Sequence, residues 1–465
     1  MSHERSIKAR RSSGVAAALV LQLLLTLVWS PACHVARAQE APYLDTGPMV
    51  GHVGPNDARI WVRATGPARL GLRIGQQPDL ADGRTVPGRA LEAAADFAGH
   101  VVVAGLEPST RYFYAPLLDG QPAVMRPYPS FVTAPPAGSP LKMRFAFGSC
   151  VGRRAAEPAA AWGDMAARVQ IDLLLMVGDN HYADSTDPVK QRAAYREQRA
   201  VAGFRDIARR TPVYGIWDDH DYGPNDSDGT AKGKELSLQT FQQWWANPAY
   251  GQPDDPGIYS KFARGDVDFF LLDVRYHRSP NKAPDDGRKT MLGAGQLAWL
   301  KRELLASKAR LKFIAAGSEW QIHGHADSWT SFDRERRDIW KFIADNKIQG
   351  VILLSGDRHF TGGYHIGGQL IEITSGPLGS TNFPTRPLPD MFLNHSEGKL
   401  YCVFDVDTQT DPGRPQPAVT LEVYRAGAGL IEKRRFTWDE INGLARIPPL
   451  PAEPPTAPAP RQPQK

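Results

Sequence analysis

The sequence predicts a small β-sandwich over residues 42–136, followed by an α/β domain over residues 141–440. In the first part, short stretches of alternating apolar and polar residues are separated by turn residues, a pattern typical of antiparallel strands in a sandwich. From residue 141 onward, apolar stretches alternate with amphipathic ones, which indicates buried strands alternating with helices. With 465 residues and 42% hydrophobic content, the chain is long enough to bury a large core in more than one domain.

The first part contains five stretches with strand-like alternation: 58–64, 70–74, 100–104, 111–117 and 130–134. The segment from Gly105 to Tyr112 resembles the tyrosine-corner turn of fibronectin type III and immunoglobulin-like domains, with a plain hairpin as the alternative. Residues 135–140 are rich in proline and glycine and offer little to bury, so we expect a linker there.

The second part is predicted to alternate strands and helices. The expected strands are 143–148, 173–177, 213–217, 267–274, 311–316, 350–355 and 370–374, with strand-rich segments at 399–406 and 418–425. The expected helices are 157–168, 188–209, 233–246, 295–307 and 334–346. In α/β folds of this kind, functional sites lie in loops beyond the carboxyl ends of the strands. The proline-rich tail, residues 448–465, is predicted to be disordered.

Residues 1–38 have the three parts of an export signal: a basic start, an apolar run at 15–29, and small residues at Ala36 and Ala38. Cleavage after Ala38 would release a periplasmic or secreted protein without a transmembrane segment. An uncleaved anchor helix is the alternative, although the apolar run is short for a membrane span.

The export route and the cysteines give further expectations. Arg10 and Arg11 fit a twin-arginine signal, but adjacent arginines also occur in ordinary basic leaders. The residues before Cys33 fit a lipoprotein cleavage site poorly, because the usual leucine is missing. After cleavage only Cys150 and Cys402 remain, which is too few for a disulfide framework.

The charge of the chain gives no indication of nucleic-acid binding. The formal net charge is +5, and the leader accounts for +4 of it, because five basic residues stand there against Glu4 alone. About +1 therefore remains after processing (5 − 4 = 1), and no basic footprint for a nucleic acid is left.

Four predicted strands are each followed by residues whose side chains bind metals. A lone cysteine after a strand is usually a buried thiol, and a lone aspartate before a helix is usually a cap. Four groups together differ, because the strand ends of one sheet converge on one edge and their side chains can share a cation there. The groups are Gly148–Cys150, Gly178–Tyr182, Trp217–Asp221 and Gly356–His359.

In order and spacing, these motifs resemble those of the alkaline phosphatase D (PhoD-like) metallophosphatases, relatives of the calcineurin-like phosphoesterases. The resemblance covers residues 42–432. The wider superfamily has Asp-x-His, Gly-Asp, Gly-Asn-His-Asp/Glu and Gly-His-x-His. This chain has Cys150 at the first motif, Asp219 in place of the asparagine and Asp357 in place of a histidine, as the PhoD-like branch does. The resemblance implies a metallophosphoesterase-type αββα sandwich behind the immunoglobulin- or fibronectin-like β-sandwich.

The resemblance also implies two neighbouring metal sites that share Asp179. The first site would be formed by Cys150, Asp179, Tyr182 and His359. The second would be formed by Asp179, Asp219 and Asp357. Thiolate and phenolate ligands favour Fe3+, and an oxygen-only site favours Ca2+, so the family implies iron with one or two calcium ions. Residue types alone also allow Zn2+ or Mn2+.

Such a cluster suits phosphate-ester hydrolysis, because two cations about 3.5–4 Å apart neutralise phosphoryl oxygens and turn a bound water into a nucleophile. The resemblance implies that His220 touches the phosphate or protonates the leaving group, with Asp221 orienting its ring. A purely structural histidine is the alternative. Arg358 can clamp a phosphate oxygen or point outward to solvent.

Other polar residues near these motifs rank lower. We interpret three of them as loop or supporting residues: Asn180, His181 and Asp184. Asn225 and Asp226 form either an Asx-turn or further oxygen ligands for an extra calcium ion. His323 and His325 follow a predicted strand and can reach the same pocket.

The sequence thus predicts an exported metal-dependent phosphoesterase acting on phosphomonoesters, phosphodiesters or both, with a small phosphate ester or an envelope phosphodiester as substrate. The alternative is an envelope polymer-binding protein with a structural metal site, but such a protein would not need His220 and Asp221. A phospholipase-D-type enzyme is a third possibility, but its paired His-x-Lys motifs are missing from the sequence.

Overall fold

The structure is a computed structural model that describes residues 41–321, 325–368, 370–410, 413 and 415–443. The expected export signal at 1–38, the expected disordered tail at 448–465 and His323 lie outside these residues. Within them, no helix combines the length and the apolar character that crossing a membrane requires.

The N-terminal strands form two antiparallel sheets around one apolar cluster that includes Ile60, Leu72 and Tyr114. The first sheet contains β1 (Leu44–Val53), β2 (Asp57–Ala64) and β5 (Ala98–Ala104). The second contains β3 (Ala68–Gly75), β4 (Arg84–Leu91), β6 (Arg111–Leu118), β7 (Gln121–Pro122) and β8 (Ser130–Val132). The Tyr112 hydroxyl accepts a hydrogen bond from the Glu107 backbone N–H at 3.0 Å, which is the contact of a tyrosine corner.

The sequence pattern did not predict three of these strands, namely β1, β4 and β7, of which β7 is only two residues long. The alternation in β1 is interrupted by Gly47 and Pro48, and its pairing with β2 is irregular at three places. Strand β4 is mostly exposed and contains Pro87, as edge strands often do. Neither β1 nor β4 therefore has the regular apolar pattern on which the prediction depended.

The remaining strands form two larger sheets. The six-stranded sheet has the order β11-β10-β9-β19-β20-β21. Its members are β9 (Lys142–Gly148), β10 (Leu173–Val177), β11 (Val213–Ile216), β19 (Leu400–Asp407), β20 (Ala418–Arg425) and β21 (Gly429–Phe436). The seven-stranded sheet has the order β12-β13-β14-β15-β17-β16-β18. Its members are β12 (Ser260–Arg264), β13 (Val267–Leu271), β14 (Leu311–Ala315), β15 (Val351–Ser355), β16 (Thr361–Ile366), β17 (Leu370–Thr374) and β18 (Met391–His395).

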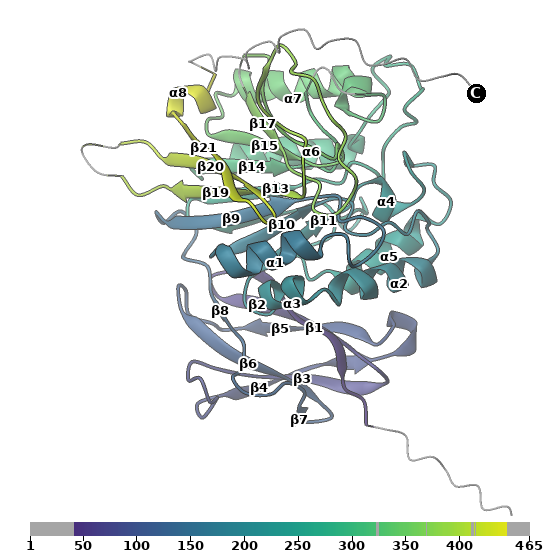
Figure 1. Cartoon of the computed structure of the whole chain (residues 1–465), viewed down its shortest axis with the longest axis vertical. Coiled ribbons are helices and arrows are strands. Elements are labelled where there is room, and N and C mark those ends of the chain that lie inside the picture. Colours follow the sequence, from purple (N-terminus) through teal and green to yellow (C-terminus); the bar gives the residue numbers. More distant parts are fainter. Residues whose placement is uncertain (1–40, 322–324, 369, 411–412, 414, 444–465) are drawn as a thin grey trace, which may run out of the picture. The chain divides into compact units, whose positions relative to one another are not determined.

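These two sheets pack face to face and are covered by helices on their outer faces, as Figure 1 shows. At the interface the Phe145 ring lies 5.2 Å from Phe269 and 4.8 Å from Phe313, measured between ring centroids. The six-stranded sheet is covered by α1 (Ala159–Arg168), α2 (Pro188–Arg199), α3 (Ala202–Ala208) and α5 (Lys234–Trp244). The other is covered by α6 (Gly293–Ala306) and α7 (Asp333–Asp345). The αββα expectation is therefore confirmed.

The helix expected at 188–209 is in fact two helices, because α2 ends at Arg199 and Val201 has extended backbone dihedrals. Helix α3 packs closely on α1 at Gly203, where an added Cβ would lie 2.5 Å from the Trp162 backbone. The break lets α3 run in a different direction from α2, and the missing side chain of Gly203 allows the close contact with α1.

The sandwich contacts the helices of the α/β domain through specific hydrogen bonds. The Trp61 indole donates to the Gln243 carbonyl at 2.8 Å, and the Tyr114 hydroxyl donates to the Arg209 carbonyl at 2.8 Å. These contacts connect both sandwich sheets to the layer formed by α3 and α5.

Glu372 is a buried carboxylate in the middle of β17 that links two segments near the carboxyl end of β15. Its Oε1 accepts hydrogen bonds from the Ser355 hydroxyl at 2.6 Å and the Trp320 backbone N–H at 2.8 Å. Its Oε2 is buried and has no partner among the described residues. Burial is the main cause that raises the pKa of Glu372 from 4.5 to about 8.

We expect Glu372→Gln to remove a pH-dependent loss of stability. Because the folded-state pKa is the higher one, the stabilisation by the protonated form is complete below about pH 4.5 and lost as the pH rises to about 8. As the pH rises through this range, the native protein should therefore lose free energy of unfolding relative to the variant. The relative loss should reach a few kcal/mol, at roughly 1.4 kcal/mol per pKa unit. Denaturant unfolding at several pH values measures this, with the exposed Glu397→Gln as control. If the difference in free energy of unfolding between Glu372→Gln and the native protein were the same at every pH, this prediction would be wrong.

Candidate metal centre

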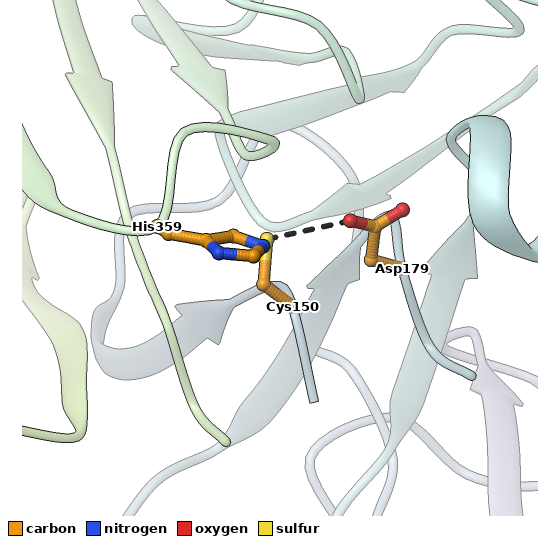
Figure 2. A group of neighbouring side chains, drawn as sticks. All are labelled: Cys150, Asp179 and His359. Atoms are coloured by element: carbon orange, nitrogen blue, oxygen red, sulfur yellow. Dashed lines mark hydrogen bonds between the residues drawn. The ribbon is translucent and has the colours of Figure 1, made fainter. Parts of the chain in front are cut away.

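The strands that precede the four motifs lie in two sheets, not in one as expected: β9, β10 and β11 belong to the six-stranded sheet and β15 to the seven-stranded sheet. Because the two sheets pack face to face, the motifs still come together. Cys150 follows β9, Asp179 follows β10 and His359 lies beyond β15. The sulfur, a carboxylate oxygen and a ring nitrogen of these residues lie within 4.8 Å of one another, and Figure 2 shows the three side chains together. The Cys150 Sγ lies 3.5 Å from Asp179 Oδ2.

Each of these three residues, and Asp357 beside them, has a left-handed backbone conformation, with φ between 52° and 70°. For residues other than glycine this conformation costs roughly 1–2 kcal/mol each, so surrounding contacts must enforce it. Backbone hydrogen bonds do so here: the Cys150 N–H donates to the Gly178 carbonyl, and the Val151 N–H donates to the Asp179 carbonyl. The turns direct the side chains to a common point.

Tyr182 and His359 complete the first group of expected ligands. The Tyr182 hydroxyl lies 3.0 Å from Asp179 Oδ2 and 3.1 Å from His359 Nε2, and it accepts a hydrogen bond from Ser380 at 2.9 Å. His359 Nδ1 lies 2.7 Å from the Thr381 carbonyl, so Nδ1 carries the proton and Nε2 presents a lone pair to the cluster. Burial lowers the pKa of His359 to about 4, which keeps the ring neutral.

The second group is centred on Asp179 and Asp219. Their oxygens and a ring nitrogen of His220 lie within 4.8 Å of one another. Asp357 is near enough for its charge to raise the pKa of Asp179, and His325 Nε2 lies 2.9 Å from Asp357 Oδ2. His325 therefore reaches the site.

Asp226 also adjoins this centre, as the sequence allowed. One carboxylate oxygen from each of three residues lies within 4.8 Å of the others: Asp219, Asp226 and Asp327. The Asp226 backbone N–H donates to Asp219 Oδ2 at 2.7 Å.

The electrostatics of the centre favour bound cations. Burial and the neighbouring carboxylates raise the pKa of Asp179 well above its usual range. Burial and the charge of Asp179 likewise raise the pKa of the Cys150 thiol. In addition, Asp179 Oδ1 is buried and has no hydrogen-bond partner among the described residues. Sulfur, imidazole and carboxylate donors with an unshared oxygen at their centre fit a metal site.

The neighbouring Asp218 is already paired. Its Oδ1 accepts a hydrogen bond from Arg275 Nε at 2.6 Å, and Arg275 Nη2 donates to Asp327 Oδ2 at 2.6 Å. Arg275 and Asp218 are fully buried, and Asp327 is almost so. Arg275 Nη2 also lies 3.9 Å from Asp219 Oδ1. This arginine therefore partly neutralises Asp219 as well as Asp218 and Asp327, but it forms no ion pair with Asp179 among the described residues.

Asp184, not Asp221, contacts the His220 ring. Asp221 is 2% exposed. Its Oδ2 accepts a hydrogen bond from the Asn180 backbone N–H at 3.1 Å, and its Oδ1 accepts one from the Asp218 backbone N–H at 2.7 Å. His220 Nδ1 is hydrogen-bonded to Asp184 Oδ1. The expectation that Asp221 orients this ring is therefore wrong. The backbone turn at Asp184, with φ 49°, gives no signal in the sequence.

Arg358 is directed to a buried acid. Its Nη1 lies 3.4 Å from Glu319 Oε1, and its side chain is 26% exposed. Glu319 is fully buried, and burial raises its pKa to about 7. Glu319 belongs to none of the four motifs, so the sequence pattern gave no signal for it.

Comparison with known proteins identifies the family. The model of the PhoD-like phosphatase family matches residues 145–402, more than half of the chain. The chain belongs to the PhoD-like phosphatase family. This confirms the resemblance drawn from the four motifs and makes the protein a phosphate-ester hydrolase. Residues 41–136 of this PhoD-like phosphatase match a second family, a domain of unknown function, DUF7800.

Individual relatives agree with this assignment. Alkaline phosphatase D of Bacillus subtilis (strain 168) is 26% identical over 421 residues, which are 75% of this chain and 71% of the relative. A solved structure of PhoD has a TM-score of 0.68 at 18% identity and covers 86% of this chain and 94% of its own. The purple acid phosphatase PPD1 from yellow lupin (Lupinus luteus) has a TM-score of 0.61 at 14% identity, with 86% and 75% covered. The PhoD-like phosphatase thus shares its fold with both structures.

We expect Asp184→Asn to lower kcat of this PhoD-like phosphatase by about 10- to 100-fold, because the amide no longer holds the His220 ring as the carboxylate does. If the ring protonates the leaving group, the loss should be largest for substrates with poor leaving groups. Steady-state kinetics on a series of aryl phosphates measures this dependence. The exposed Asp206→Asn should behave like the native enzyme, and an equal loss on all substrates would contradict the role.

Proposed function

We propose that this PhoD-like phosphatase is an exported metal-dependent enzyme that hydrolyses phosphomonoesters, phosphodiesters or both. The observation that carries the proposal is the convergence of Cys150, Asp179 and His359, from three separate strand ends, within 4.8 Å. The signal-like composition of residues 1–38 supports a periplasmic or secreted location. The substrate would be a small phosphate ester or a phosphodiester of the cell envelope.

We assign the catalytic function to residues 141–440 and a supporting function to the sandwich at 42–136. The first metal site would be formed by Cys150, Asp179, Tyr182 and His359, and its thiolate and phenolate suit Fe3+. The second would be formed by Asp179, Asp219 and Asp357, whose oxygens suit Ca2+. When bound, the ions would neutralise the phosphoryl charge and activate water for attack.

The chain's own side chains would position the ester and move the proton. His220, held at Nδ1 by Asp184, would donate a proton to the leaving oxygen. The Tyr182 ring lies 4.1 Å from the His220 ring between centroids and limits its rotation. Arg358, placed beside Glu319, would bind a phosphate oxygen through its remaining N–H groups. A polymer-binding protein with a structural metal would not need this acid and its positioning partner.

The ligand role of Cys150 is tested by comparing Cys150→Ala with Cys402→Ala, since both thiols are free and buried. We expect Cys150→Ala to lose iron and at least about 100-fold in activity, because the site loses its only sulfur donor. Cys402 lies in β19, and its substitution should leave both unchanged. Elemental analysis, with hydrolysis of para-nitrophenyl phosphate and its bis ester, gives the result. Full metal content and activity in Cys150→Ala would refute the ligand role.

Substitution of the shared carboxylate should be at least as damaging. Asparagine tolerates the left-handed backbone of Asp179, so Asp179→Asn should retain the fold. We expect it to lower the content of both metals and the activity together, whereas the exposed Asp338→Asn should lower neither. Loss of a single metal with the other intact would contradict a bridging position.

A further inference from the structure

A cleft of about 470 Å³ lies between the sandwich and the catalytic domain, away from the metal centre. The sandwich contributes Arg111 and residues 130–132, and the catalytic domain contributes Arg144, Arg210 and Arg264 among others. The cleft adjoins the amino ends of β10 and β11, because residues 169–172 and 210–212 line it. Cys150 lies six residues beyond Arg144 along β9, so roughly 20 Å separate this cleft from the metal centre.

The lining of this cleft is strongly basic. It contains four arginines and a single acid, Asp172. Arg144 is paired with Glu422, at 2.5 Å. Arg111 bonds only the Ser130 hydroxyl and Arg210 only the Ala166 carbonyl, so neither is paired with an acid in the described part of the chain. Arg111, Arg210 and Arg264 against Asp172 leave an excess of about two positive charges (3 − 1 = 2).

Arg264 is the feature that indicates a ligand. Its side chain is buried, with 6% of the residue exposed, and Nη1 is shielded from solvent and has no hydrogen-bond partner within the described part of the chain. No carboxylate of the described residues forms an ion pair with its guanidinium. A buried, unpaired guanidinium is unfavourable, and an incoming anion with several oxygens would relieve it.

We propose that this cleft is a second anion site that binds a phosphate group. The planar guanidinium offers paired N–H donors that match the oxygens of a phosphate, and the arginines come from both domains. A bound phosphate would therefore connect the sandwich to the catalytic domain. The volume lies in the range of small-molecule sites, roughly 300–1,000 Å³, so either free phosphate or a phosphate on a polymer chain can enter.

The test follows the melting temperature of the metal-loaded enzyme as ligand is added. The ligands are inorganic phosphate, a hydrolysis-resistant phosphorothioate oligothymidylate, and acetate at equal ionic strength. The variants are Arg264→Met and the exposed Arg111→Gln, with Arg209→Gln as control. Arg209 neighbours Arg210, is paired with Asp206 and does not line the cleft.

We expect a phosphate-dependent rise in melting temperature, which reports binding to the native state. In Arg264→Met and Arg111→Gln the cleft should bind phosphate at least 10-fold more weakly. In Arg209→Gln it should bind phosphate as strongly as in the native enzyme. Without ligand, Arg264→Met should melt no lower than the native enzyme, because it loses an unpaired buried charge. Competitive inhibition of para-nitrophenyl phosphate hydrolysis by phosphate, which reports the metal centre, should be unchanged.

Each ligand has a defined outcome. An Arg264-dependent shift with inorganic phosphate identifies the free ion as the ligand, and such a shift with the oligomer alone identifies a polymer-borne phosphate. The proposal is overturned if neither shift depends on Arg264 or Arg111, or if acetate gives the same dependence. Since every readout except inhibition is independent of turnover, an inactive enzyme would not affect the result.

Discussion

Acidic side chains are gathered at the metal centre with too few basic ones to neutralise them. Arg275 serves Asp218 and Asp327, so Asp179 and the Cys150 thiol face one another in a buried space without a cation of the chain. Burial raises the pKa of both groups, and neighbouring charges add to it: Asp179 for the Cys150 thiol, and Asp219 with other carboxylates for Asp179. The arrangement is favourable only when a cation binds and neutralises these acidic groups. The geometry that collects the ligands is therefore also what makes the site bind metal.

Buried central strands hold these closely spaced acidic groups in place. Strands β10, β14 and β15 are buried along their whole length, as expected for parallel strands covered on both faces. The loops that follow the strands place ligands through single left-handed residues, so a rigid edge becomes a set of precisely directed side chains. Hydrogen bonds such as that between His359 and Thr381 then fix which atom faces the centre.

The sequence predicted this edge well, because buried apolar runs mark the central strands and four of these runs end at a ligand motif. The expected strands at 173–177 and 370–374 agree with β10 and β17 at both ends. Strands β12, β16, β18 and β21 were not predicted. In β16 and β18, Gly362, Gly363 and the polar Asn394 weaken the pattern. Contacts between distant loops, such as Arg358 with Glu319, and turns such as that at Asp184 depend on tertiary structure and leave no periodic signal.

The position of β9 has a consequence for the order in which the molecule is assembled. This strand, which leads to Cys150, lies between β10 and β19, and β19 comes from residues some 250 positions later in the chain. Until those residues are available, β9 is an open edge and the sheet behind the cysteine is unfinished. Pairing over such separations forms slowly, because a long loop must close first. We therefore expect the metal centre to be completed only after β19 has paired with β9, and a chain that ends before β19 would lack the finished sheet behind Cys150.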